Sequence, residues 1–142
     1  MKGLVDKKGN TILHIAVIDN LEDLFESCLG HHGLIDERNY AGKTALHLAS
    51  EYGRIWMVER LIHGGANIEL TCYTGDPYGD SCKFGTPLHH ACGMGHGKVV
   101  RLLLSAGADA RGDYGGGCPM DWARESGQTA VIDMLSSCLR PM

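Results

Sequence analysis

Two kinds of short amphipathic segment alternate along the chain, and glycine-rich stretches separate them. The first kind reads GNTILHIAV at 9–17, GKTALHLAS at 42–50, GTPLHHACG at 85–93 and GCPMDWARE at 117–125. The second kind places apolar residues at i, i+1 and i+4, as Met57, Val58 and Leu61 do. That spacing falls on one face of a helix. The pattern therefore predicts four units, each made of a helix, a glycine turn, a second helix and a glycine-rich hairpin.

The first segment of each unit carries residues that begin and end a helix. A threonine precedes three of the four segments, where its side-chain oxygen can accept a backbone N–H of the first turn; these are Thr11, Thr44 and Thr86. Three residues later comes a histidine that can reach back to the cap, as glutamate does in a capping box; these are His14, His47 and His89. Nine residues after each cap position comes a residue that tolerates the left-handed conformation of helix ends; these are Asn20, Gly53, Gly95 and Gly127.

The cap positions recur at an interval near 33, since Thr44 follows Thr11 by 33 residues and Cys118 follows Thr86 by 32. The interval from Thr44 to Thr86 is 42, so about nine residues are inserted there, within LTCYTGDPYGDSCKFG at 70–85. The Gly, Asp and Pro content of this stretch predicts a loop that projects from the hairpin edge. One unit cannot bury its apolar faces alone, so we expect the units to stack.

These phrases resemble ankyrin repeats, and GTPLHHACGMGHGKVVRLLLSAGADA at 85–110 matches the family pattern almost throughout. The first unit departs from the pattern with Ile12 for proline, and the fourth with Cys118 for threonine and Asp121 for histidine. The resemblance implies an all-α solenoid of about four helix-turn-helix units with β-hairpin loops, in one domain over 1–142. The repeats are expected at about 6–38, 39–80 (with the insertion near 70–83), 81–112 and 113–142.

Members of this family mostly bind other proteins through the hairpin tips and the exposed side of the first helix. Carried over by position, this implies a partner-binding surface made of Lys8, Tyr40, Lys43, Glu51, Tyr52, Met94 and Tyr114. Tyr73 and Tyr78 lie in the insertion and would extend the row of tips. Tyrosine is enriched at interfaces because it combines a large contact area with a hydrogen-bonding end. The alternatives are that these rings merely tolerate partial exposure and that the insertion is a tolerated surface loop.

Trp56 is a further candidate, because it falls in the second helix where the other units carry Asp23, Lys98 and Ala130. It marks either a second contact surface on the outer helices or a ring that lies flat over its neighbours. The lysines of the expected surface favour an acidic rim on the partner; they are Lys7, Lys8, Lys43 and Lys83.

Composition narrows the function classes. The length of 142 residues suits one domain, and the net charge of −4 argues against a general nucleic-acid binder. No stretch approaches the ~20 apolar residues of a membrane span, and the start lacks the apolar core of a secretory signal. We therefore expect a cytoplasmic or nuclear location, reduced cysteines and a monomer or a heterocomplex.

Catalytic and metal chemistry have weak support in the sequence. Zinc-ligand types occur at Cys72, Cys82, His89, His90 and Cys92, but a Cys-x9-Cys spacing fits no zinc knuckle and His89 already serves a cap. Cys118 lies at a helix start, which can activate a thiol, but Asp121 opposes that effect and no general base is evident. A zinc-dependent hydrolase is thus a remote alternative. The sequence predicts no enzyme, no cofactor and no metal.

The two ends of the chain differ. The last unit becomes polar at Arg124, Ser136 and Ser137, as a terminal repeat facing water should, whereas the first unit is apolar on most sides. A partner or upstream sequence would cover that first flank, unless it is a poorly capped end. The function expected is a non-catalytic protein-interaction module, an adaptor or an inhibitor. The alternative is a regulatory or targeting segment of a larger enzyme or multidomain protein.

Overall fold

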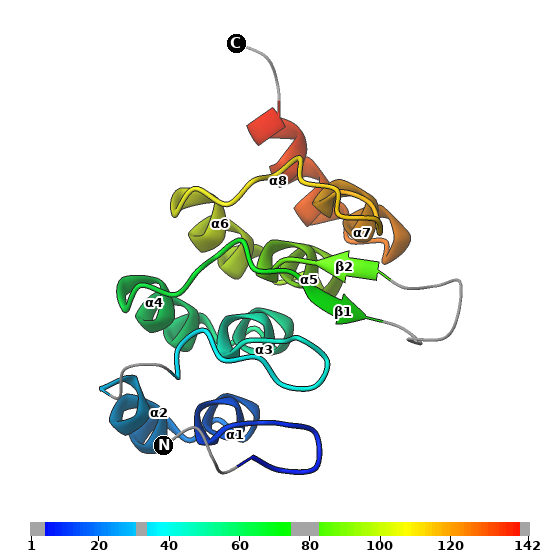
Figure 1. Cartoon of the computed structure of the whole chain (residues 1–142). Helices are drawn as coiled ribbons and strands as arrows, with labels where there is room; N and C mark the ends of the chain where they lie inside the picture. Colours follow the sequence, from blue (N-terminus) through cyan, green and yellow to red (C-terminus); the bar gives the residue numbers. More distant parts are fainter. Residues whose placement is uncertain (1–4, 31–33, 75–82, 140–142) are drawn as a thin grey trace.

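A computed structural model describes residues 5–30, 34–74 and 83–139 of the chain. The helices form four consecutive pairs: α1 (Ile12–Ile18) with α2 (Glu22–Leu29), α3 (Ala45–Tyr52) with α4 (Ile55–His63), α5 (Pro87–Met94) with α6 (Gly97–Ser105), and α7 (Pro119–Glu125) with α8 (Thr129–Leu139). Figure 1 shows the pairs stacked from the N-terminus at the bottom to the C-terminus at the top, with the hairpin loops projecting from one edge. This confirms the all-α solenoid.

Stacking is continuous through both layers of helices. The inner helices α1, α3, α5 and α7 contact one another in succession, and the outer helices α4, α6 and α8 do the same. Inner helices can approach closely because a fully buried alanine recurs in each of them, at Ala16, Ala49, Ala91 and Ala123. The apolar face of the outer helices closes the core, with Phe25, Val58, Val100 and Leu135 fully buried. The core is therefore one cluster that runs through all four units.

The expected helix caps are present. In the first unit the backbone N–H of Thr11 donates to Nδ1 of His14 (3.0 Å), and the N–H of His14 points back to Oγ1 of Thr11 (3.4 Å). The Thr44–His47 pair repeats this arrangement. Because Nδ1 accepts a hydrogen bond from the backbone, the proton of each neutral ring resides on Nε2.

That second ring nitrogen links each unit to the next, which the sequence pattern did not predict. Nε2 donates to a hairpin carbonyl of the following unit: His14 to Lys43 O (2.8 Å), His47 to Gly85 O (3.2 Å), and His89 to Gly112 O and Gly117 O (3.0 and 3.1 Å). All three histidines are buried, and burial lowers the pKa of His47 to about 3. The three rings are therefore neutral at physiological pH, and each one links its repeat to the next by a hydrogen bond.

The fourth cap keeps the geometry with different chemistry. The backbone N–H of Cys118 donates to Oδ2 of Asp121 (3.1 Å), and the Cys118 thiol lies 3.4 Å from the same oxygen. The hydrogen bond from the Cys118 backbone lowers the pKa of Asp121. Unlike a histidine, the Asp121 carboxylate has no second N–H to donate to a neighbouring unit, so this cap stabilises only the start of its own helix.

The insertion between the second and third units begins and ends as an ordered ribbon rather than as a bare loop. Strands β1 (Cys72–Thr74) and β2 (Lys83–Gly85) pair antiparallel, with Cys72 opposite Gly85 and Tyr73 opposite Phe84. The ladder extends the hairpin edge, as Figure 1 shows. The expected repeat boundary at 80/81 lies outside the described residues.

The two flanks of the stack differ as the sequence suggested. Position 124 is an exposed arginine, whereas the equivalent Val17, Ser50 and Cys92 of the other units are buried against the next repeat. On the first unit Ile12 and Leu21 are exposed, although the residues equivalent to Ile12 in later units, such as Ala45, are buried. The C-terminal flank is polar and the N-terminal flank is apolar.

Candidate functional site

Three of the hairpin tips, those before α1, α3 and α7, are built on one repeated turn. An Asp or Asn side chain five residues before the cap accepts two backbone N–H groups of its own tip. Asp6 accepts from Lys8 N and Asn10 N (both 2.9 Å), Asn39 from Ala41 N and Lys43 N (3.0 and 2.9 Å), and Asp113 from Gly115 N and Gly117 N (2.9 and 3.2 Å). These residues were not predicted from the sequence, although each lies five positions before a cap residue.

The first two tips are also joined to each other. Nδ2 of Asn39 donates to Oδ1 of Asn10 (2.9 Å), and the N–H of Tyr40 donates to the Lys8 carbonyl (3.0 Å). The Tyr40 ring covers Gly9, since a Cβ at Gly9 would come within 2.5 Å of it. The two tips therefore form one rigid rim.

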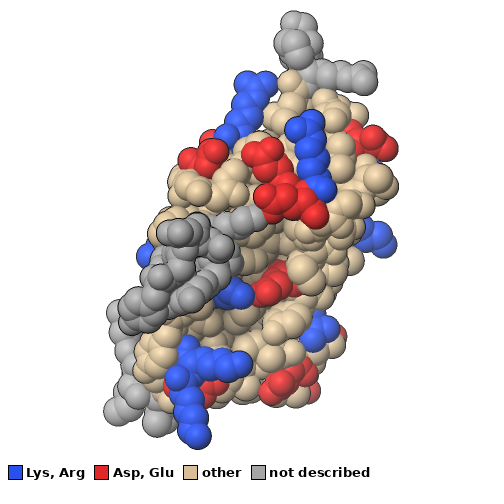
Figure 2. Space-filling view, turned by 90° about the vertical axis from the view of Figure 1, so that its right-hand side faces the viewer, with Lys and Arg blue, Asp and Glu red and all other residues tan. Residues whose placement is uncertain are grey.

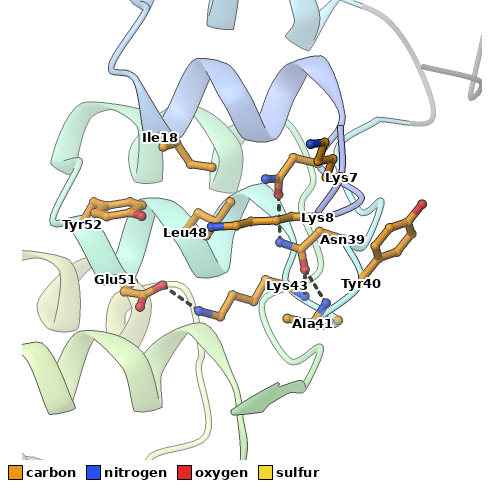
Figure 3. A pocket seen from close by; sticks show the side chains of 12 residues that line it. Lys7, Lys8, Ile18, Asn39, Tyr40, Ala41, Lys43, Leu48, Glu51 and Tyr52 are labelled. Carbon is orange, nitrogen blue, oxygen red and sulfur yellow. Dashed lines mark hydrogen bonds and ion pairs between the residues drawn. The ribbon is translucent and has the colours of Figure 1, made fainter. Parts of the chain in front are cut away.

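A groove of about 810 Å³ lies between this rim and the inner helices α1 and α3. Ile18, Leu48 and Tyr52 line its helix side, and Figure 3 shows how they face the lysines of the rim. Five of the expected partner-binding residues meet here: Lys8, Tyr40, Lys43, Glu51 and Tyr52. We refer to this space, with these residues and Lys7, as the rim groove.

Charge in the rim groove is uneven. Nζ of Lys43 lies 3.0 Å from Oε2 of Glu51, and both side chains are largely shielded from solvent. Within the described part of the chain, no ion pair involves Lys7 or Lys8, and both lysines are exposed. In Figure 3 the Lys8 side chain runs across the groove toward Leu48. The groove therefore carries a surplus of positive charge at its centre.

Tyr52 is held in place at the end of α3. Its ring is 46% exposed, and the guanidinium of Arg54 lies 5.6 Å from the ring centroid. Arg54 in turn donates to the carbonyls of Val17 (3.3 Å) and Ile18 (3.2 Å) in the preceding unit. Arg54 therefore packs against the ring of Tyr52 and at the same time joins the first two repeats.

Met94 and Tyr114 lie outside the rim groove. Met94 occupies the position in α5 that Tyr52 occupies in α3, and it is 54% exposed. Tyr114, at the fourth tip, places its ring 6.0 Å from that of His89. Partial burial and the neighbouring carboxylates of Glu69 and Asp109 raise the pKa of Tyr114. Tyr114 combines exposure with a bracing role that the sequence did not indicate.

Among the remaining aromatic candidates, Trp56, Tyr73 and Tyr78, the structure describes the side chain of Trp56 only. Trp56 is 41% exposed, and its ring centroid lies 5.7 Å from that of the buried Phe25, so it both packs on a neighbour and faces solvent. The backbone of Tyr73 lies in β1. The Tyr73 side chain and the whole of Tyr78 are outside the described residues.

Beneath the ribbon, Cys72 and His90 form a buried pair. The Cys72 sulfur lies 2.9 Å from Nε2 of His90. Burial raises the pKa of Cys72 to about 11 and lowers that of His90 well below its usual value. The pair is therefore a neutral thiol–imidazole contact, and this thiol is not activated as a nucleophile.

The other zinc-ligand types are used structurally. Both ring nitrogens of His89 are engaged, one in the cap and one with the next hairpin. Burial raises the pKa of Cys92 to about 12. Among the described residues, no group of three or more His, Cys, Asp or Glu side chains is placed to hold a metal ion. Cys82 lies outside those residues.

Four stacked helix pairs with a shared row of braced hairpin tips define a helical-repeat protein of the interaction class. A family model described as "Ankyrin repeats (3 copies)" matches residues 1–72 and 74–139. The chain belongs to the ankyrin-repeat family, whose repeats form a non-catalytic protein-interaction fold.

Relatives at about one-third identity are much longer proteins. The chain is 33% identical over 130 residues to transient receptor potential cation channel subfamily A member 1 of Homo sapiens, covering 92% of this chain and 11% of the relative. It is 36% identical over 104 residues to nuclear factor NF-kappa-B p105 subunit of Mus musculus, covering 72% and 10%. It is 34% identical over 102 residues to probable E3 ubiquitin-protein ligase XBOS31 of Oryza sativa subsp. japonica, covering 72% and 21%. The chain thus spans about a tenth to a fifth of these relatives.

Within the described ranges, no helix combines the length and the apolar character needed to cross a membrane.

Proposed function

We propose that this chain is an adaptor or an inhibitor that works by occupying the surface of a partner protein. The observation that carries the proposal is the rim groove, where five of the positions expected from the family pattern converge. Rigid placement supports it, because a pre-organised surface loses little conformational entropy on binding. Arg54 packs on the ring of Tyr52, and the joined tips fix the backbone that carries Lys8 and Lys43.

The contact surface extends from the rim groove along the inner helices. The half-buried Ile18 and the exposed Tyr52 and Met94 are the last residues of α1, α3 and α5. Apolar and aromatic side chains of this kind supply most of the binding energy at protein interfaces, while the surrounding polar contacts exclude water. Tyr40 and Tyr114 would contribute at the tips, and Tyr73 and Tyr78 would extend them.

Affinity capture with two matched variants tests this assignment. Tyr52→Ala combined with Met94→Ala removes the exposed inner row, and Trp56→Ala removes a similarly exposed aromatic side chain from the outer helices. We expect the double variant to recover its specific partners several-fold less well, with a melting temperature lowered by no more than about 5 °C, and Trp56→Ala to recover them normally. If only Trp56→Ala reduced the recovery of partners, the interface would lie on the outer helices instead. Unchanged capture by the double variant would contradict the inner surface.

A second candidate is a regulatory or targeting segment of a larger protein. The share of the relatives that the chain covers favours it, since each is several times longer. An antibody against this chain, used on extracts of the source cells, separates the two. A band near 15.3 kDa supports a stand-alone adaptor or inhibitor, and a much larger band supports the segment.

A further inference from the structure

The rim groove is lined by three lysines, of which Lys43 forms an ion pair and the other two form none among the described residues. Lys43 is paired with Glu51 at 3.0 Å. Lys8 extends across the same groove toward Leu48, and no described acidic side chain forms an ion pair with it, although its charge is among the causes that lower the pKa of Asp6 at the same tip. Lys7, exposed at the same tip, adds to this charge. An ammonium group beside apolar side chains gains most from a ligand that brings both a negative charge and an apolar group.

We propose that the part of the partner that enters the rim groove is an acidic peptide segment. A carboxylate side chain contacts Lys8 and Lys7, and a neighbouring apolar side chain packs against Ile18, Leu48 and Tyr52. This inference rests on the proposed function and specifies the chemistry of the partner. The groove volume of about 810 Å³ is enough for a few side chains of an extended segment.

The charge of the other end of the hairpin row limits the length of the acidic segment. Asp109 and Asp113 are exposed on the third and fourth units, with the exposed Arg111 between them. Figure 2 shows acidic side chains on the middle and upper part of this face, with basic side chains beside them at the upper end and others near the first units. A long polyanion lying along the row would meet these carboxylates. A short acidic peptide confined to the first two tips would not, so the arrangement favours a peptide over a nucleic acid.

A displayed library of random peptides, selected on the immobilised full chain, is the first test. The wild-type chain should enrich peptides with Asp or Glu next to an apolar residue. The variant that combines Lys7→Glu with Lys8→Glu should enrich these peptides at least ten-fold less. The control, Lys98→Glu combined with Arg101→Glu, makes the same charge change at exposed positions of α6 and should behave as wild type. Enrichment of the same peptides by the Lys7/Lys8 variant would overturn the proposal.

The second test uses one enriched peptide and looks for a gain in affinity, which misfolding cannot produce. Glu51→Gln releases Lys43 from its partner, so it should tighten peptide binding two- to five-fold. Lys8→Ala should weaken it three- to ten-fold, with a smaller effect at high salt. Both changes are measured by fluorescence anisotropy with the labelled peptide. Equal affinities for all three proteins would contradict the assignment.

Two further outcomes separate this inference from the proposed function. Enrichment of basic or purely apolar peptides, or tighter binding of a labelled oligo-dT strand than of the peptide, would overturn the acidic-peptide proposal and leave the interaction module intact. If the chain enriches no peptide class and capture is also unchanged in the Tyr52/Met94 double variant, both proposals fail.

Discussion

The first two repeats and the last two use the same helix pairs but treat the space behind the hairpins differently. Between the first two tips and their inner helices the rim groove is open, at about 810 Å³. Around the third and fourth units the indole of Trp122 occupies the inner face. It packs on His89 and His90, with centroid distances of 5.2 and 5.4 Å, and its Nε1–H donates to the Gly116 carbonyl (2.9 Å).

The difference arises at one position of the repeat. Four residues after the cap stand Ile15, Leu48, His90 and Trp122 in the successive units. Aliphatic side chains there leave room above α1 and α3, whereas the imidazole and the indole fill it. Gly85 and Gly93 provide the room for the indole, since a Cβ at Gly85 would come within 2.7 Å of its ring. The same backbone repeat thus forms an open groove at one end and a packed brace at the other.

The largest expected effect comes from removing the brace. Trp122→Ala should lower the free energy of unfolding by about 3–5 kcal/mol, because the nearly buried indole leaves a cavity and a hydrogen bond is lost. Urea denaturation followed by circular dichroism measures it. Trp56→Ala is the control and should cost about 1 kcal/mol, since that ring is exposed over much of its surface. Similar losses for the two variants would contradict the comparison.

Acid should act on the braced end before the groove end. The braced end holds His89 and His90, and His47 of α3 reaches it through the bond from its Nε2 to Gly85 O. Burial is the chief cause that lowers the pKa of all three rings, to about 3 for His47. Each folded pKa lies below the unfolded value of ~6.5, so below pH 6.5 the unfolded chain binds more protons. The part of the stability that depends on these neutral rings is therefore fully present above pH 6.5 and is lost as the pH falls toward 3.

For His47, protonation of the unfolded chain lowers the free energy of unfolding by about 2 kcal/mol at pH 5. Urea midpoints at pH 7.5 and pH 5 measure the total. Hydrogen exchange at pH 5 should show α5 and β2 opening before α1, where His14 is the single buried capping histidine. A midpoint that does not change with pH would show that these rings are not held neutral.

Local signals in the sequence were sufficient for the fold. The threonine caps, their histidines and the glycine turns each act within a few residues, and the structure confirms them at Thr11, Thr44 and Thr86. The links between units were not predictable in this way. The Nε2 bond of His14 to Lys43 O and the pairing of Lys43 with Glu51 depend on how one unit sits on the next. The sequence therefore predicted five residues that line the rim groove but did not show which lysine forms an ion pair.

A smaller effect should come from loosening the rim that closes the groove. Asn39→Ala removes an acceptor for two backbone N–H groups and a donor to Asn10, so it should cost about 1–2 kcal/mol. Asn39→Asp keeps the acceptor for the turn, loses the bond to Asn10 and sets a carboxylate oxygen beside Oδ1 of Asn10. Its cost should therefore come from the link between the tips alone and stay below that of Asn39→Ala. Asp113→Ala, at a tip that has no such link among the described residues, is the matched comparison in the braced half. If Asn39→Asp costs as much as Asn39→Ala, the acceptor bonds to the turn are not what hold the tip.

The smallest effects on stability are expected at the residues assigned to binding. Lys8→Ala should change the free energy of unfolding by no more than about 0.5 kcal/mol, because its side chain is exposed and it forms no ion pair within the described ranges. Tyr52→Ala should cost up to about 1 kcal/mol, because the contact with Arg54 is lost, and Tyr52→Phe should be neutral. Denaturation curves for the three variants measure these values. A loss above about 2 kcal/mol for Lys8→Ala would mean that the open half is braced as the other half is, by charge instead of by an indole.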